Sequence, residues 1–213
     1  HGTISGFKEL ITTDVIANAA TTTLDMANFV NSDFTKVTMS NTFADATTGA
    51  VTDVFAITNA KDGLATLSLN ALDLTDASVT FARQTDGTAN ALTIVSSVAS
   101  AAGSIAANDE ETLTFDSSAG AMDYTAVSAT DMTTLVVKGD EQMDLGTLTG
   151  TILASVDATG LEDSDGANAD FIFDMSSSTV NMTVTGNASS THGGDMQITT
   201  GSGADTITGT KQV

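Results

Sequence analysis

The stretch MTTLVVKGDEQMDLGTLTGTILASVDATGL, from Met132 to Leu161, consists of short apolar runs separated by Gly and Asp. Val, Thr and Ile fill the runs and favour strands, whereas Gly and Asp favour turns. No run is long, and every gap between two runs carries turn-forming residues. The stretch therefore predicts a succession of short β-strands joined by turns.

The same pattern extends over most of the chain. Two segments differ from it: Lys8 to Ala20 is compatible with a short helix, and the Ala-rich Ser96 to Asn108 with a helical turn or a surface loop. The strands expected are Val37 to Met39, Val54 to Ile57, Ala65 to Leu69, Val79 to Phe81, Ala91 to Val95, Thr112 to Phe115, Thr134 to Val137, Thr151 to Val156, Phe171 to Phe173, Val180 to Val184, Met196 to Ile198 and Thr206 to Thr208.

Degenerate internal repetition accompanies these strands. A turn-plus-strand unit appears as DGTANALTI at Asp86 to Ile94 and as DGANADFIF at Asp165 to Phe173. An apolar–Asp–apolar triplet recurs at Leu24-Asp25-Met26, Leu72-Asp73-Leu74, Met143-Asp144-Leu145 and Phe173-Asp174-Met175. The irregular spacing favours stacked rungs of varying length over a repeat of fixed length.

These patterns predict an all-β protein, organised as a β-helix or β-solenoid-like stack of short strands. A β-sandwich is the alternative, above all for residues 1–107. The spacing of strands changes near Asn108 to Glu111, which predicts a β-rich domain over residues 1–107 and a solenoid-like domain over 108–213. The chain lacks an initiator Met, so we expect a piece of a longer protein.

The composition restricts the function. Six basic residues face 27 acidic ones, a net charge of -21, which disfavours nucleic acid and anionic membranes as partners. The acids are 22 Asp and only 5 Glu, and Asp is a common ligand in tight calcium loops. No apolar stretch is long enough to span a membrane.

Nothing in the sequence favours catalysis. The chain has no Cys, only two His, of which His1 is terminal, and no Gly-Lys-Ser/Thr phosphate loop. A pair of Asp residues is expected by chance among 22, and a carbohydrate cleft would normally carry more aromatic residues than Tyr124 alone. We therefore expect a protein that is not an enzyme.

One segment near the C-terminus carries a specific motif. TGSGADTIT, from Thr200 to Thr208, resembles the calcium-binding nonapeptide of the RTX family, with Gly201, Gly203, Asp205 and Ile207 at matching places and Thr200 in place of the first Gly. Small glycines permit unusual turn conformations, the Asp supplies a carboxylate, and the large apolar residue starts a core strand. The resemblance implies Ca²⁺ bound between two successive turns through oxygen ligands.

The candidate for the neighbouring turn is HGGDMQI, from His192 to Ile198. Gly193, Gly194 and Asp195 make it a shortened copy of the same motif. Calcium held between these two turns is the expectation from the resemblance.

A second candidate site lies in the acidic loop LEDSDGANAD. Asp163, Asp165, Asn168 and Asp170 either converge on calcium or form a solvated turn, and the loop does not match an EF-hand. The other acidic segments, Asn108 to Glu111 and Gly139 to Glu141, are interpreted as solvated turns.

A broader resemblance covers Met132 to Thr210. Leu153-Ala154-Ser155-Val156-Asp157-Ala158-Thr159-Gly160-Leu161 is similar to a phrase repeated in RTX-type bacterial surface-layer proteins, where rungs also precede an RTX turn. The resemblance implies a secreted protein of the extracellular cell surface, exported by type I secretion, that assembles with itself in a calcium-dependent lattice and contacts cell-surface polysaccharide. Two alternatives remain: an adhesin or matrix fibre, and a domain of a secreted RTX hydrolase.

Overall fold

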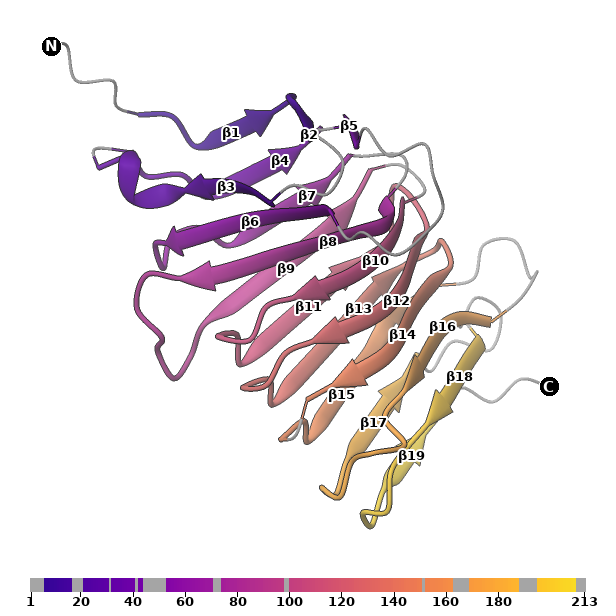
Figure 1. Ribbon diagram of the computed structural model, residues 1–213. Helices are drawn as coiled ribbons and strands as arrows, with labels where there is room; N and C mark the ends of the chain where they lie inside the picture. Colours follow the sequence, from indigo (N-terminus) through magenta and orange to yellow (C-terminus); the bar gives the residue numbers. More distant parts are fainter. Residues whose placement is uncertain are drawn as a thin grey trace, which may run out of the picture.

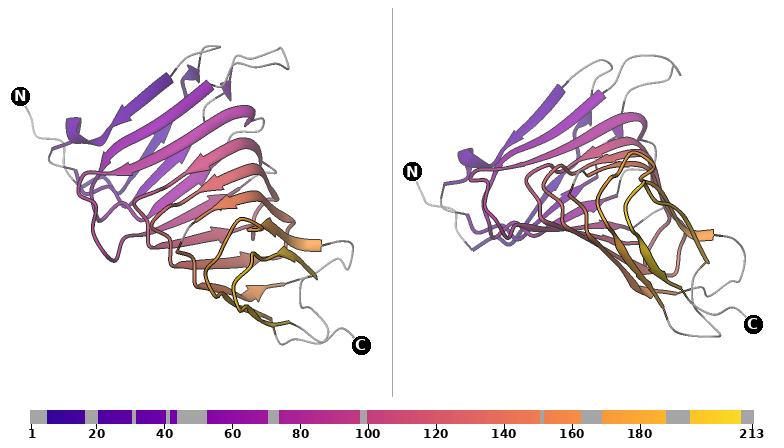
Figure 2. Two further views of the ribbon diagram at one scale, coloured as in Figure 1. Left: turned by 60° about the horizontal axis from the view of Figure 1, so that its bottom comes forward. Right: turned by 90° about the horizontal axis from the view of Figure 1, so that it is seen from below.

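The computed structural model describes residues 6–16, 21–30, 32–40, 42–43, 53–70, 74–97, 100–150, 152–162, 169–187 and 195–209. The chain winds back and forth between two facing sheets, and each circuit, here called a rung, adds one strand to each of them (Figures 1 and 2). All strand pairings are parallel. The predicted β-solenoid is therefore confirmed, and the β-sandwich alternative, which requires antiparallel sheets, is wrong.

Nine strands form the first sheet. In spatial order they are β1 (Glu9–Thr12), β4 (Lys36–Met39), β7 (Thr66–Leu69), β9 (Ala91–Ser96), β11 (Thr112–Asp116), β13 (Thr134–Gly139), β15 (Ser155–Leu161), β17 (Thr183–Gly186) and β19 (Thr206–Thr208).

Eight strands form the second sheet. From the N-terminal end they are β3 (Thr21–Asp25), β6 (Asp53–Ala60), β8 (Leu74–Arg83), β10 (Ser100–Ala106), β12 (Met122–Ser128), β14 (Met143–Thr149), β16 (Ala169–Asp174) and β18 (Asp195–Thr199). Two further elements lie in the early rungs: a small sheet of β2 (Val15–Ile16) and β5 (Thr42–Phe43), and the 3₁₀ helix η1 (Met26–Asn28).

The core lies between the two sheets and consists of columns of stacked side chains. Strands in a sheet lie about 4.8 Å apart, so each inward side chain rests on its partner in the next rung. One column passes in register through Leu92, Leu113, Leu135, Val156, Val184 and Ile207. Its first five members are buried. Such columns explain why a chain with few aromatic residues can still build a continuous core.

Both sheets continue across residues 107 and 108. There β9 pairs with β11, and β10 pairs with β12. The hydrophobic core likewise runs on from Ile105 to Leu113 as one cluster.

Most of the expected strands are present, and two begin late. The strand expected from Thr151 begins at Ser155, and the one expected from Val180 begins at Thr183. The strands β3, β12 and β14 were not predicted, because polar residues interrupt their apolar pattern.

The two helical expectations are wrong. Lys8 to Ala20 contains β1 and β2, and Ser96 to Asn108 contains β10. The strand β10 is paired on both sides, with β8 and with β12, and this pairing overrides the helical propensity of its alanines.

Aspartates of the recurring triplet form local backbone turns, either within a strand or at its end. The Oδ1 atoms of Asp25, Asp144 and Asp174 accept the backbone N–H two residues further on, at 3.0, 2.8 and 2.7 Å. Asp116 and Asp157 make the same bond at 3.1 and 3.0 Å. This is an Asx turn, so the triplet marks places where a strand bends or ends. The triplet containing Asp73 falls outside the described residues.

Candidate functional site

The predicted RTX-like turn lies at the C-terminal end of the solenoid, between β18 and β19. Its backbone rests on the turn of the preceding rung, which runs from Met175 to Met182. Ser202 N donates to Ser178 O at 2.8 Å, and Thr206 N donates to Met182 O at 2.8 Å. The two corner turns are therefore stacked by backbone hydrogen bonds.

Two side chains reinforce this stack. Asp205 Oδ1 accepts Met182 N–H at 3.0 Å, and Asn181 Oδ1 accepts Ala204 N–H at 2.8 Å. The carboxylate of Asp205 thus already accepts a hydrogen bond from the backbone of the preceding rung. A cation held between the rungs would use the same carboxylate.

The glycines of this turn are required by close packing. A Cβ on Gly201 would lie 1.8 Å from Ser178 O, and one on Gly203 would lie 2.2 Å from Val180 O. Neither glycine has a positive φ; among the described residues the positive-φ glycines are Gly6, Gly139 and Gly146. The expectation that Gly201 and Gly203 adopt a conformation closed to other residues is therefore wrong, and the reason for glycine is the approach of one backbone to another.

The structure describes only some of the other predicted metal ligands. Asp195 opens β18, the strand whose far end leads into the RTX-like turn, and pairs with Ala169. Asp170 lies within β16. Gly193, Gly194, Asp163, Asp165 and Asn168 lie outside the described residues.

In the part of the chain that the structure describes, no three His, Cys, Asp or Glu side chains gather into a potential metal site. The RTX-like turn contains one carboxylate, that of Asp205, and carboxylate oxygen is a hard ligand of the type that Ca²⁺ takes. Calcium binding there remains a proposal.

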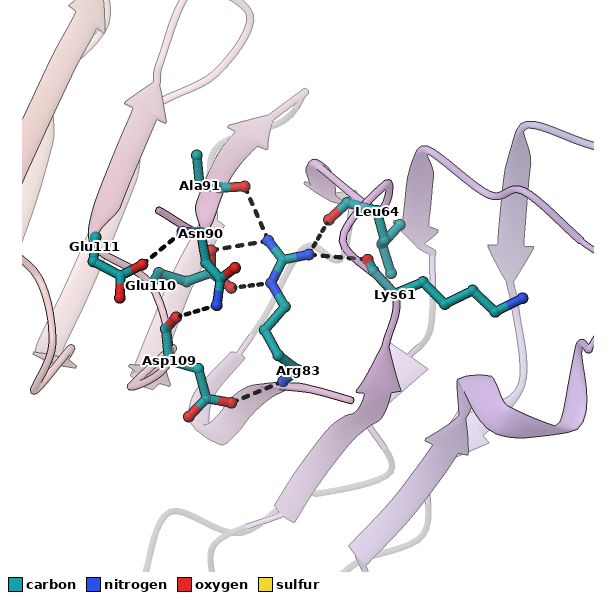
Figure 3. Close-up of polar contacts among 8 residues, drawn as sticks. All are labelled: Lys61, Leu64, Arg83, Asn90, Ala91, Asp109, Glu110 and Glu111. Atoms are coloured by element: carbon teal, nitrogen blue, oxygen red, sulfur yellow. Dashed lines mark hydrogen bonds and ion pairs between the residues drawn. The ribbon is translucent and has the colours of Figure 1, made fainter. Parts of the chain in front are cut away.

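The most elaborate polar cluster surrounds Arg83, the single arginine of the chain, at the end of β8 (Figure 3). Its Nε and Nη2 donate to the two carboxylate oxygens of Glu110 at 2.6 and 2.9 Å. Its Nη1 donates to Lys61 O at 3.0 Å and Leu64 O at 2.8 Å, and Nη2 also donates to Ala91 O at 2.9 Å. All five guanidinium donors are thereby used.

This cluster is a structural clamp. Both side chains of the ion pair are almost fully buried, at 1% and 0% exposure. Burial raises the pKa of Glu110, and the hydrogen bonds from Arg83 oppose that rise. The guanidinium has no donor left for a ligand. Its hydrogen bonds run to residues of neighbouring rungs, so the cluster holds those rungs together. The interpretation of Asn108 to Glu111 as a solvated turn is wrong for Glu110.

Acidic side chains complete the same corner. Asp109 Oδ2 accepts Arg83 N–H at 2.8 Å, and Glu111 Oε2 accepts Asn90 N–H at 2.6 Å. Desolvation and the charges of Asp109, Asp131 and Glu111 raise the pKa of Asp86. The acidic side chains of this corner therefore repel one another, although Asp109 and Glu111 each accept a backbone hydrogen bond.

A surface hollow lies on the nine-stranded sheet near the ends of β13 and β15. It is lined by Ser118, Lys138, Gly139, Asp140, Gly160 and Glu162. Lys138 Nζ pairs with Asp116 Oδ2 at 2.8 Å beside it. These donors and acceptors suit hydroxyl groups, but no aromatic ring lines the hollow.

The fold and these sites define a class of protein, a parallel two-sheet β-solenoid with hydrogen-bonded corner turns. Comparison with protein-family models, with curated proteins and with solved structures finds no match for this chain. Among the described residues, no helix has the length and hydropathy needed to cross a membrane.

Proposed function

We propose that this chain is a structural, non-catalytic protein of an extracellular cell surface, which assembles with copies of itself when calcium is present. The observation that supports self-assembly is the stacking of the rungs, in which each strand offers its backbone donors and acceptors to the strand of the next rung. A rung of another copy can be added by the same kind of pairing.

The charge supports a role for calcium. A net charge of -21 keeps copies of the chain apart, and only six basic residues are available to pair with 27 acidic ones. A divalent cation removes this repulsion by bridging carboxylates, which monovalent salt cannot do even where it screens the charge. The RTX-like turn at Gly201 to Asp205 and the acidic segment from Asp163 to Asp170 are the proposed calcium ligands.

The remaining parts of the proposal rest mainly on the resemblance to RTX-type surface-layer proteins. Export to the cell surface suits an acidic chain without Cys, and the proposed route is type I secretion. Cell-surface polysaccharide is the second partner we propose, with the hollow beside Lys138 as its place of contact. The adhesin or matrix fibre and the domain of a secreted hydrolase remain the alternatives.

The test compares assembly under three conditions. Light scattering and electron microscopy are recorded in millimolar calcium, in chelator, and in sodium chloride of equal ionic strength. We expect ordered assemblies in calcium only, which dissolve when chelator is added. Equal assembly in all three conditions would refute calcium control. A monomer in all three, together with turnover of a polysaccharide, would favour the hydrolase.

A further inference from the structure

The two outer faces of the solenoid differ in charge. Side chains along a strand alternate between the core and the outside. In the nine-stranded sheet, the charged side chains that point outward from β4 to β17 are Lys36, Asp116, Lys138 and Asp157, two of each sign. Both lysines form ion pairs, Lys36 with Glu9 at 3.0 Å and Lys138 with Asp116 at 2.8 Å. This outer face from β4 to β17, here called the neutral face, therefore has almost no net charge.

The outer face of the eight-stranded sheet is acidic. Its outward charged side chains include Asp123, Asp144 and Asp174, and no outward basic side chain is described in this sheet. Asp123 and Asp144 occupy paired positions of β12 and β14, where like charges oppose one another. The net charge of -21 is thus spread unevenly over the molecule, and the neutral face is the sheet surface that contributes least to it.

The neutral face is covered with hydroxyl groups in register. One ladder runs through Thr112, Thr134, Ser155 and Thr183. Another begins with Thr66, Thr93 and Thr114. A hydroxyl both donates and accepts hydrogen bonds, whereas a carboxylate only accepts them. Two identical hydroxyl surfaces can therefore bond to each other, which two identical carboxylate surfaces cannot do.

We propose that two copies of this chain associate face to face through the neutral face. This inference rests on the proposed function and names the surface by which copies first meet. The central part of a protein–protein interface is depleted in charged residues, as the neutral face is. Because both copies use the same patch, the contact closes on itself as a twofold dimer. This dimer is the building unit of the larger assembly.

The size of the neutral face suits a reversible contact. It comprises seven strands, each paired on both sides. At about 4.8 Å between strands and about 3.3 Å per residue over about five residues, it covers roughly 550 Å² in each copy. A pair of such faces buries roughly 1,100 Å², close to the lower limit of about 1,000 Å² for a specific interface. So small an interface does not overcome the repulsion of two strongly acidic chains, and calcium is needed to reduce that repulsion.

The first test uses matched substitutions on the two outer faces. Thr114→Asp adds an acid to the neutral face, and Thr80→Asp adds one to the eight-stranded sheet. Both threonines are half-buried, point outward and lie between paired strands. Sedimentation in calcium should show dimers of the parent and of Thr80→Asp, and a dimer dissociation constant raised by about tenfold or more for Thr114→Asp, since like charges then face each other.

Circular dichroism in chelator shows whether both variants of this pair are folded as monomers. An equal effect of the two substitutions on dimer formation, or no effect of either, would overturn the proposal.

The second test measures coverage of the neutral face without adding charge. The chain has no Cys, so Thr114→Cys and Thr80→Cys each carry a single thiol. Their rates of reaction with a maleimide are compared in calcium and in chelator. We expect calcium to slow the reaction of Thr114→Cys and to leave that of Thr80→Cys nearly unchanged. Equal protection of both thiols, or of neither, in calcium would contradict the face-to-face contact.

The outcomes separate this inference from the proposed function. If the parent chain assembles in calcium while Thr114→Asp assembles equally well, self-assembly stands and the neutral face is refuted as the contact. If the parent chain stays monomeric in calcium, in chelator and in sodium chloride, both are refuted.

Discussion

At the scale of single residues, Arg83 and Glu110 form a buried ion pair in a chain that has only six basic residues. The pair is buried and bidentate, and the arginine also binds three carbonyl oxygens from neighbouring rungs. The sequence carried a weak signal for it, since the chain has one arginine and its acidic residues are otherwise in excess. Nothing in the local pattern around Glu110 distinguishes it from its acidic neighbours, which are less buried.

Removing one partner of this pair should be costly. Glu110→Ala leaves a buried guanidinium without its carboxylate, and we expect a loss of about 3 to 5 kcal/mol in the free energy of unfolding. The control is Lys138→Met, which breaks the partly exposed pair with Asp116 and should cost about 0 to 1 kcal/mol. Urea denaturation in chelator measures both, and a Glu110→Ala loss no larger than that of the control would contradict the clamp.

At the scale of elements, local turns of the backbone account for part of the aspartate content. Five aspartates accept the N–H of the second residue after them, and Asp205 accepts an N–H from the preceding rung. The same residue type is also the proposed calcium ligand. Structural and metal-binding roles therefore overlap at Asp205, and substitutions must be chosen to separate them.

Asp205→Asn and Asp205→Ala separate the two roles. Asn keeps an oxygen that can accept Met182 N–H but removes the carboxylate charge, whereas Ala removes both. We expect both variants to lose one calcium ion by titration calorimetry, and only Ala to lower the melting temperature in chelator. Unchanged calcium stoichiometry in both variants would show that Asp205 is not a ligand.

At the scale of the whole molecule, the stack is long, thin-cored and strongly negative. Its charge opposes compaction, and ions that bind the folded state alone stabilise it by mass action. Extracellular calcium modules bind with dissociation constants of roughly 10⁻⁴ to 10⁻³ M. A site at tenfold excess of calcium over its dissociation constant contributes about 1.4 kcal/mol.

Calcium should therefore raise the melting temperature by several degrees relative to chelator. Sodium chloride at equal ionic strength is the control, and it should raise the melting temperature less, since it screens charge without occupying a site. Thermal unfolding followed by circular dichroism makes the comparison. A melting curve that calcium leaves unchanged would refute the proposed sites.

The sequence by itself determined the class of structure. Short β-favouring runs, turn residues in every gap and the repeated nine-residue unit predicted an all-β stack of rungs. In both copies of that unit the aligned apolar positions are core residues, Leu92 and Ile94 in one and Phe171 and Phe173 in the other. These features are visible because they depend on residues close together in the chain. Gly201, Gly203 and Asp205 were placed in one turn for the same reason.

Only the tertiary structure decided which rung meets which. The pairing of β10 with β8 and β12 made the Ala-rich segment a strand. The close approach of the turn from Met175 to Met182 leaves no room for a Cβ at Gly201 or Gly203. Arg83 and Glu110 meet across 27 positions of sequence. Each of these features depends on a neighbour in the next rung, and that neighbour's position follows from the length of every intervening loop. Local propensity contains no information about that register, whereas the stacking of buried columns selects it.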